Sequence, residues 1–166
     1  MKKISLVAAA CNNMGIGKNG DLPWRLRKEM SFFTKVTSET KEDGKQNAVV
    51  MGRKTWFSIP EKYRPLAGRY NVILSKNLKE CPSGADMLSE SLDDAIKQLS
   101  EPPLESLESA ACYRIYLTRV MADFDCDTFF PEFDTNLFNL VSDPDVPSEI
   151  QEEKGIQFKY EVYEKK

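Results

Sequence analysis

Three short apolar runs most constrain the fold of this chain. They are ISLVAAA at 4–10, NAVVMG at 47–52 and YNVILS at 70–75. A strand with one solvated face alternates apolar and polar residues, whereas a strand covered on both faces reads as a continuous apolar run. A helical pattern around Leu26 follows the first run, and a short helical start at 54–58 follows the second. This alternation predicts an α/β fold with a doubly wound, mainly parallel sheet.

The second half of the chain predicts one more helix and further strands. Ser91 is a good N-cap for the helical pattern that directly follows it. Strands are predicted at 114–120, 136–142 and 156–163, and the last alternates as a half-exposed antiparallel strand does. The sheet should therefore be mixed. The length predicts a single domain, 1–166.

Residue usage limits the possible chemistry. The chain has no histidine, which excludes histidine-based triads and histidine-ligated metal sites. Its four cysteines are Cys11, Cys81, Cys112 and Cys126, and their spacing offers no CxxC pair for zinc or redox work. Free thiols suit a reducing compartment, so we expect a cytoplasmic protein. A net charge of −3 gives no sign of a nucleic-acid surface.

The N-terminal run before Cys11 has two interpretations. A basic start, seven apolar residues and a cysteine after small residues resemble a lipoprotein signal peptide. A buried first strand accounts for the same residues, and we favour it.

The helical pattern around Leu26 contains one carboxylate on its apolar side. With Leu26 at zero and about 100° per residue, Met30 lies at about +40° and Phe33 at about −20°. Glu29 lies at about −60°, where the core should be. Burying an ionised carboxylate is unfavourable unless something pairs with it. Glu29 therefore either bends to water or an arginine, or is held in an apolar cleft to bind a ligand.

The run GIGKNG at 15–20 matches the GxGxxG pattern of dinucleotide-binding folds. That fingerprint needs a helix that opens within it, and here Pro23 follows three residues later. We therefore reject a Rossmann site. Three glycines in six residues predict a mobile loop that can close over a ligand, with a plain surface loop as the alternative.

Basic and hydroxyl residues follow two of the apolar runs. Arg53, Lys54 and Thr55 come directly after the second run, and Ser75 and Lys76 close the third. The carboxyl ends of parallel strands share one edge of the sheet, and unpaired amides at a helix start favour phosphate. Together these residues could hold two separate phosphates, although each alone is more often a solvated surface residue.

The run DFDCD at 123–127 resembles the start of a calcium loop. The sixth position is Thr128 rather than the glycine that such a loop needs. Phe124 and Cys126 alternate with the acids, so an edge strand is the favoured interpretation. No metal site is predicted.

Several runs, in this order, resemble the animal type of the dihydrofolate reductase family. Besides the Glu29 helix they are NNMGIGKNGDLPW, KQNAVVMGRKTWFSIPEKYRPLAGR, VILS, SLDDA, LTR, DCDTFFPEFD and QEEKGIQFKYEVYEK. The resemblance implies a monomeric enzyme of one-carbon metabolism that transfers hydride from NADPH to C6 of 7,8-dihydrofolate and protonates N5. It also implies that the enzyme binds small molecules, dihydrofolate and folate, without nucleic acid or membrane.

The resemblance assigns roles to residues of this chain. The acid matching Glu29 accepts hydrogen bonds from a ring nitrogen and the 2-amino group of the pterin, while the proton for N5 arrives through water. Leu22 and Trp24 complete the catalytic set. Arg69 would hold the α-carboxylate of the glutamate tail, and Thr118 would steady Glu29.

Two further sets follow from the same resemblance. The remaining substrate residues contact or line the pocket of the pterin and aminobenzoyl rings: Ala8, Met30, Phe33, Thr34, Ile59, Pro60, Tyr63 and Leu66. The NADPH-binding residues lie on the first strand, the covering loop and two strand ends: Ala8, Gly15, Ile16, Gly17, Lys18, Asn19, Gly20, Asp21, Arg53, Lys54, Thr55, Ser75, Lys76 and Asn77.

The chain departs from the family pattern after the helix at Ser91. The family has an interior strand there that ends in two glycines, followed by a cofactor-binding helix. Residues 101–112 contain no β-branched residue, so nothing stands in for that strand, and about twenty residues of the family pattern are absent. Two functions therefore stay open: a working reductase, or a non-catalytic folate- or pterin-binding protein or altered splice product with impaired NADPH binding.

Overall fold

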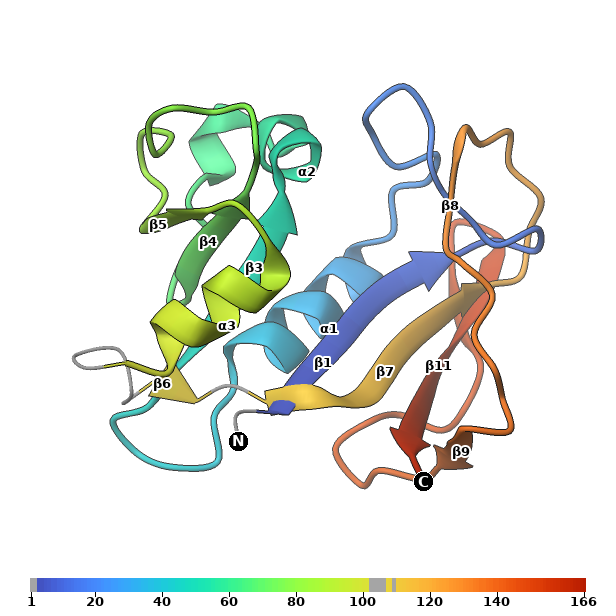
Figure 1. The fold of residues 1–166 in the computed structure, drawn as a ribbon. Helices are drawn as coiled ribbons and strands as arrows, with labels where there is room; N and C mark the ends of the chain where they lie inside the picture. Colours follow the sequence, from blue (N-terminus) through green and yellow to red (C-terminus); the bar gives the residue numbers. More distant parts are fainter. Residues whose placement is uncertain (1–2, 102–106, 109) are drawn as a thin grey trace. The chain divides into compact units, whose positions relative to one another are not determined.

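The computed structural model describes residues 3–101, 107–108 and 110–166. Its contacts divide the chain into two compact units. Unit 1 holds residues 3–33 and 110–166, and unit 2 lies within 34–109. Each unit has its own sheet (Figure 1).

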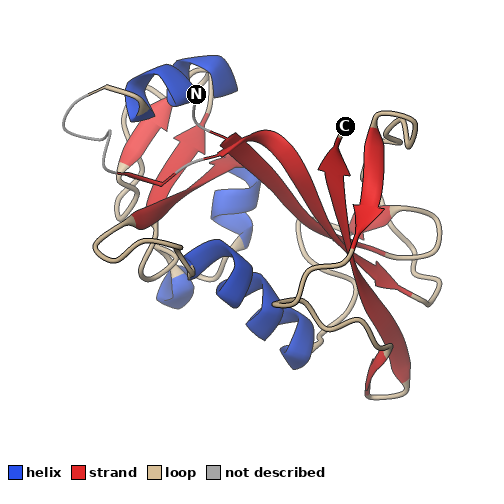
Figure 2. Cartoon of the chain, turned by 90° about the horizontal axis from the view of Figure 1, so that it is seen from below, coloured by secondary structure: helices blue, strands red, loops and turns tan. Residues whose placement is uncertain are grey.

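Unit 1 is built on a sheet of long strands. β1 (Lys3–Ala10) runs parallel to β7 (Ala110–Val120), and β7 runs antiparallel to β11 (Ile156–Lys165). β11 also pairs with β10 (Gln151–Glu153) and β9 (Phe138–Val141). Figure 2, with strands in red, shows the long strands of this unit side by side.

Two short strands and a helix complete unit 1. β2 (Gly15–Gly17) pairs antiparallel with β8 (Thr128–Phe129). Helix α1 (Arg27–Ser38) begins in unit 1, and the boundary between the units falls within it, after Phe33.

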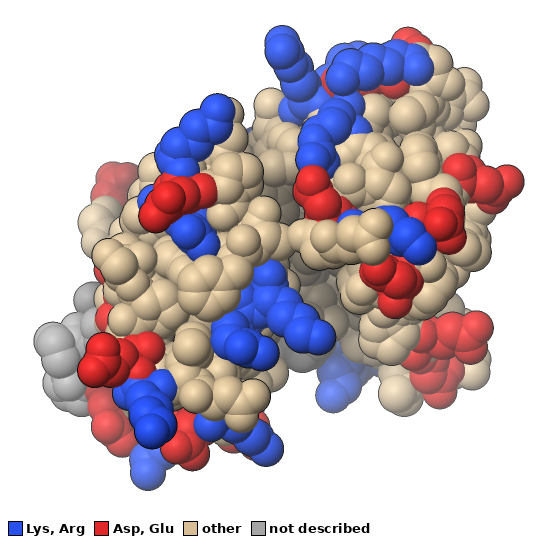
Figure 3. Space-filling model, turned by 90° about the horizontal axis from the view of Figure 1, so that it is seen from above, with Lys and Arg blue, Asp and Glu red and all other residues tan. Residues whose placement is uncertain are grey.

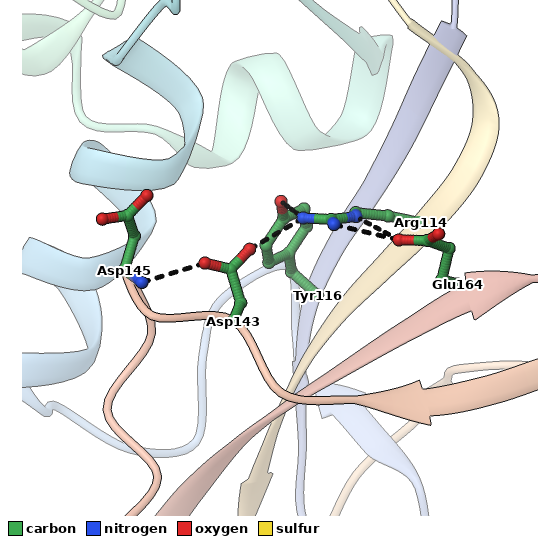
Figure 4. Close-up of polar contacts among 5 residues, drawn as sticks. All are labelled: Arg114, Tyr116, Asp143, Asp145 and Glu164. Carbon is green, nitrogen blue, oxygen red and sulfur yellow. Dashed lines mark hydrogen bonds and ion pairs between the residues drawn. The ribbon is translucent and has the colours of Figure 1, made fainter.

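A charged cluster joins β7, β11 and the loop after β9 in unit 1 (Figure 4). Arg114 of β7 donates to Asp143 at 2.7 Å and to Glu164 of β11 at 2.9 Å, and its guanidinium also contacts the hydroxyl of Tyr116 at 3.2 Å. Asp143 in turn accepts from the amide of Asp145 at 2.9 Å. These charges satisfy one another, which marks the cluster as structural.

Unit 2 has a parallel sheet with one helix packed on it. β3 (Gln46–Gly52) pairs with β4 (Tyr70–Leu74), and β4 pairs with β5 (Met87–Ser89). α3 (Leu92–Leu99) covers this sheet through Ala95 and Leu99, which pack with Val72. As predicted, Ser91 caps α3, because its Oγ accepts from the amide of Asp94 at 3.1 Å.

Short elements follow β3 at its carboxyl end. α2 (Arg53–Ser58) starts at the residue after β3, and a 3₁₀ turn, η1 (Glu61–Tyr63), follows it. Within the described part of the chain, no helix has the length and apolar character that a membrane span requires.

Several sequence predictions need correction. Leu107–Glu108 form a two-residue strand, β6, parallel to Gln46–Asn47 of β3, and β7 begins at Ala110 rather than at 114. The 101–112 segment is therefore not free of strand; the rest of that prediction falls on 102–106 and 109, outside the described residues. Backbone pairing with a neighbour gives these residues strand structure despite their low β-propensity.

Two further predictions about strands were wrong. Residues 123–127 form a loop, and their acids contact Asn12, Lys18 and Asn19 instead of joining a sheet edge. The 4–10 run is a strand, as the favoured interpretation predicted. However, β1 ends its sheet, and Leu6 is 41% exposed, so the strand is not covered as its apolar run predicted.

Candidate active site

Glu29 lies at the centre of the buried face of α1. Its side chain is only 6% exposed, and Leu26 and Phe32 on either side are also buried, whereas Met30 is 48% exposed. The buried face is thus turned from the predicted Leu26, Met30 and Phe33 stripe toward Phe32. The cause is Tyr160 of β11, whose ring stacks on Phe32 with centroids 3.9 Å apart.

The carboxylate of Glu29 has one hydrogen-bond partner among the described residues. Thr118 of β7, itself buried, donates from Oγ1 to Oε1 at 3.4 Å. No lysine or arginine of the described chain forms an ion pair with it. Burial raises the pKa of Glu29 to about 7, and the Thr118 hydrogen bond only partly opposes that shift. The interpretation that Glu29 bends to water or an arginine is therefore wrong.

Tyr160 completes the wall beside Glu29. It pairs with Thr118 across β11 and β7, and its hydroxyl donates to the carbonyl of Lys28 at 3.4 Å. Burial, together with the nearby charge of Glu29, raises the pKa of Tyr160 to about 12. An aromatic ring, a helix and a central strand thus hold the carboxylate in an apolar setting.

Trp24 contributes a buried donor to unit 1. Its ring is 3% exposed and packs with Cys11, Leu26 and Val120, and it meets Phe124 at 5.4 Å. Its indole N–H has no acceptor among the described residues. Since buried donors are nearly always satisfied, this N–H is suited to a ligand or a ligand-bound water.

The glycine-rich segment forms a hairpin tip. Lys18 and Asp21 exchange backbone hydrogen bonds of 2.8 and 3.0 Å around Asn19 and Gly20. Both central residues have positive φ, 50° and 75°, which is the turn geometry that an Asn-Gly pair favours. The tip is held to the loop before β8, where the amide of Asn19 donates to Asp127 at 2.9 Å.

Arg69 is the buried cation of unit 2. It is 8% exposed, and its guanidinium donates to Oγ1 of Thr37 at 2.8 Å and to the carbonyl of Ala67 at 3.0 Å. Burial lowers its pKa, and no carboxylate in the described part of the chain pairs with it. A guanidinium in this state is suited to a carboxylate brought by a ligand.

Asn71 fixes the backbone around Arg69. Its fully buried side chain donates to the carbonyls of Arg69 and Leu66 at 2.8 and 3.0 Å and accepts from the amide of Leu66 at 2.9 Å. The backbone N–H of Asn71 donates to a carboxylate oxygen of Asp86 at 2.7 Å. Sequence reasoning missed this residue, although a polar side chain inside the apolar run YNVILS was a usable signal.

The predicted phosphate residues lie at one edge of unit 2. Gly52 of β3 pairs with Leu74 of β4, so the segments that begin at Arg53 and Ser75 leave the sheet together. Ser75 Oγ accepts from the amides of Asn77 and Leu78, both at 3.1 Å. Figure 3 shows Lys and Arg side chains, with a few carboxylates among them, on the face that unit 2 turns to the viewer.

The other predicted site residues fall into the two units. Unit 1 holds Ala8, Gly15, Ile16, Gly17, Lys18, Asp21, Leu22, Met30 and Phe33, and unit 2 holds Thr34, Lys54, Thr55, Ile59, Pro60, Tyr63 and Lys76. Ala8 and Ile16 pack against one core cluster of unit 1. Leu22 and Tyr63 are exposed, at 37% and 60%.

Known proteins resemble this chain along its whole length. The dihydrofolate reductase family profile matches residues 3–165. Dihydrofolate reductase of Gallus gallus is 48% identical over 184 aligned residues, which cover 99% of this chain and 97% of that protein. The chain belongs to the dihydrofolate reductase family. It is therefore an enzyme of the oxidoreductase class.

Further members of the dihydrofolate reductase family agree. The enzyme of Rattus norvegicus is 48% identical over 185 residues, covering 100% of this chain and 99% of that protein. The solved Schistosoma mansoni dihydrofolate reductase superposes with a TM-score of 0.86 at 37% identity and covers 99% of both chains. The predicted α/β fold with a mixed sheet is thereby confirmed.

The alignment also bears on the departure from the dihydrofolate reductase pattern. The comparison with the rat enzyme spans 185 positions, whereas this chain has 166 residues, so at least 19 positions are unmatched in this chain. This agrees with the shortening inferred from the sequence.

Proposed function

We propose that the chain reduces 7,8-dihydrofolate to 5,6,7,8-tetrahydrofolate with NADPH as the hydride donor. One observation carries the proposal, namely a buried carboxylate beside Tyr160 and Thr118 that has no ion-pair partner among the described residues. Such a group is unfavourable for the fold alone, because its desolvation is not repaid by an internal ion pair. A flat donor pair on a ligand would satisfy it.

Glu29 binds and orients the pterin in this proposal. Its two oxygens accept from a ring nitrogen and the 2-amino group, a pairing that a low-dielectric site strengthens. With a pKa of about 7, the carboxyl exists in both protonation states near neutral pH and can respond to charge that develops on the ring. Thr118 keeps one oxygen in place, and the proton for N5 comes from water.

The other substrate residues bind the rest of the molecule. Trp24 offers its free indole N–H to the pterin side. Among the residues of unit 1, Met30 and Phe33 would contact the rings. The substrate residues that unit 2 contributes are Ile59, Pro60, Tyr63 and Leu66. Arg69 takes the α-carboxylate of the glutamate tail, which would supply the carboxylate partner that the described residues do not.

NADPH fits the groups at the β3 and β4 ends of unit 2. Arg53, Lys54 and Thr55 would bind one phosphate region, and Ser75, Lys76 and Asn77 the other, supported by the register that brings these segments together. When bound, the reduced nicotinamide supplies a hydride. Ala8, Leu22 and the 15–21 segment would enclose that end of the cofactor and exclude water.

A folate- or pterin-binding member of the family with impaired NADPH binding is the second candidate. It is favoured by the unmatched alignment positions and by β6, which extends along β3 for only two residues. Isothermal titration calorimetry with folate and, separately, with NADPH, beside a turnover assay, distinguishes the two. Binding of both with turnover supports the reductase. Folate binding without NADPH binding or turnover supports the second candidate, and the absence of folate binding contradicts both.

We also propose that residues 1–166 act as one monomeric domain in the cytoplasm, with small molecules as the partners. Sedimentation in the presence of folate tests the monomer, since a concentration-dependent mass would contradict it.

A further inference from the structure

Two cysteine thiols meet in unit 1. Cys11 follows β1 and is 2% exposed, whereas Cys126 lies in the loop before β8 and is partly exposed. Both are free thiols, and their Sγ atoms are 3.8 Å apart, at contact distance for an S–H···S interaction.

The surroundings hold the two sulfur atoms together. A Cβ on Gly15 would lie 2.3 Å from the Sγ of Cys126, so only glycine leaves room for that thiol. Asn13 Oδ1 accepts from the Cys11 thiol at 3.0 Å and from the amide of Gly15 at 3.3 Å. A disulfide has an S–S distance of about 2.05 Å, so the sulfur atoms would approach by roughly 1.8 Å, a shift within reach of side-chain torsions.

The pair joins two segments that also meet through the pairing of β2 with β8 and through backbone hydrogen bonds, such as that from the amide of Phe130 to the carbonyl of Met14 at 2.8 Å. Nearer the tip, the contacts between them are exposed and polar. Asn12 Nδ2 donates to Asp123 at 3.0 Å, and Lys18 Nζ lies 3.1 Å from Asp125. Exposed hydrogen bonds and ion pairs of this kind contribute little and open readily. A covalent bond between Cys11 and Cys126 would keep the segments together.

We propose that Cys11 and Cys126 form a reversible disulfide, with a low-molecular-weight disulfide such as oxidised glutathione as the oxidant. The bond fixes the segment 11–21 to the loop 122–130 and slows its opening. Bond formation is independent of the proposed function, whereas the effect on turnover rests on it, because the 15–21 segment is there assigned to the cofactor.

The chemistry balances as thiol–disulfide exchange. The partly exposed Cys126, as thiolate, attacks one sulfur of the oxidant, forms a mixed disulfide and releases one small thiol after protonation. Cys11 loses its proton to water and attacks the Sγ of Cys126, which expels the second small thiol. The protein loses two protons and two electrons, and the oxidant is reduced to two thiols.

Non-reducing digestion and mass spectrometry of the full chain, treated with oxidised glutathione, test the bond. We expect a cross-linked peptide pair containing Cys11 and Cys126 that dithiothreitol separates. Cys126→Ser should abolish the cross-link, and the matched variant Cys81→Ser, which alters an exposed cysteine elsewhere, should retain it. A glutathione adduct alone, or a disulfide that involves Cys81 or Cys112, overturns the proposal.

Two measurements test its consequence. Tryptic cleavage after Lys18 should slow on the order of tenfold in the oxidised chain, because cleavage requires the segment to open. The kcat should fall about fivefold on oxidation and recover with dithiothreitol, with no such change in Cys126→Ser. If the cross-link forms while both rates stay unchanged, the locking role is wrong. If the reduced chain shows no turnover, the proposed function fails, and the cleavage rate still decides this proposal.

Discussion

A glutamate contacts each face of β7, and the partners and the pKa shift of the two glutamates differ. Thr118 and Arg119 are neighbours on this strand, so their side chains point to opposite faces. Thr118 meets Glu29 with a single long hydrogen bond, whereas Arg119 binds Glu161 at 2.9 Å. Burial dominates over the Thr118 hydrogen bond at Glu29, and the pKa of Glu29 rises to about 7.

Glu161 shows what a structural carboxylate looks like in the same unit. Burial also pushes its pKa upward, but hydrogen bonds from Arg119 and Tyr163 outweigh that effect, and the net pKa is lowered. Lys159 adds a third contact at 3.3 Å. The difference teaches that the fold supplies cations to a carboxylate that contributes to stability, whereas Glu29 receives none from the described residues.

The largest expected effect is a difference in turnover between two glutamate-to-glutamine variants, one on each face of β7. Glu29→Gln should lower turnover about 10²–10³-fold, because a neutral amide cannot accept both pterin hydrogen bonds or respond to charge on the ring. Glu161→Gln should leave turnover per folded molecule close to wild type. Steady-state kinetics with dihydrofolate and NADPH measure both. Equal losses in the two variants would erase the distinction.

The pH dependence of stability should have opposite signs on the two faces. The pKa of Glu29 is raised, so the contribution of Glu29 to stability is present below pH 4.5 and is lost as the pH rises to about 7. Relative to Glu29→Gln, the wild type should lose about 3 kcal/mol of unfolding free energy over that range. The lowered pKa of Glu161 gives the reverse, a contribution present above the ordinary glutamate value and lost as pH falls.

Urea unfolding of wild type, Glu29→Gln and Glu161→Gln across this pH range measures the two trends. Parallel curves for wild type and Glu29→Gln would mean that Glu29 is not a desolvated group.

Near neutral pH the two variants should also differ in stability. Glu161→Gln should lower the unfolding free energy by about 1–2 kcal/mol, since it removes charged hydrogen bonds to Arg119 and Lys159. Glu29→Gln should keep or raise it, because an unpaired buried charge disappears. Thermal and urea melts at fixed pH give the comparison. A destabilised Glu29→Gln would assign Glu29 a structural role.

The smallest effect should come from Thr118. Thr118→Val removes the hydrogen bond that favours the charged carboxylate, so turnover should fall about threefold to tenfold and the pKa of Glu29 should rise further. Thr118→Ser keeps a hydroxyl and should recover most of the rate. A pH profile of kcat/KM that is the same in Thr118→Val and wild type would exclude this role.

The sequence predicted the positions of the helices and strands better than it predicted which strands pair with one another. Ser91, the Glu29 helix and the apolar strand runs depend on local periodicity and capping, and each was found. The apolar run of β1 predicted cover on both faces, yet β1 ends its sheet, because strand neighbours are decided by distant parts of the chain. The pairing of Leu107–Glu108 with β3 escaped prediction for the same reason.

In the candidate site, too, local patterns and the resemblance identified single residues, whereas contacts between distant residues were not predicted. Helix periodicity alone identified Glu29 as misplaced, and the resemblance supplied Thr118 and Arg69. Periodicity could not show that Phe32 rather than Met30 faces inward, because a Tyr160 far along the chain decides which face of α1 is buried. The contact of Cys11 with Cys126 likewise joins residues 115 positions apart.

The ionisation of Glu29 is the most direct test of the account. The carboxyl carbon of Glu29, assigned by comparison with Glu29→Gln, can be followed by ¹³C NMR through a pH titration of the ligand-free chain. We expect a pKa of about 7, set mainly by burial, with no ion-pair partner among the residues that the structure describes. A pKa at or below the ordinary glutamate value of 4.5 would show a solvated or ion-paired side chain, and would contradict the account.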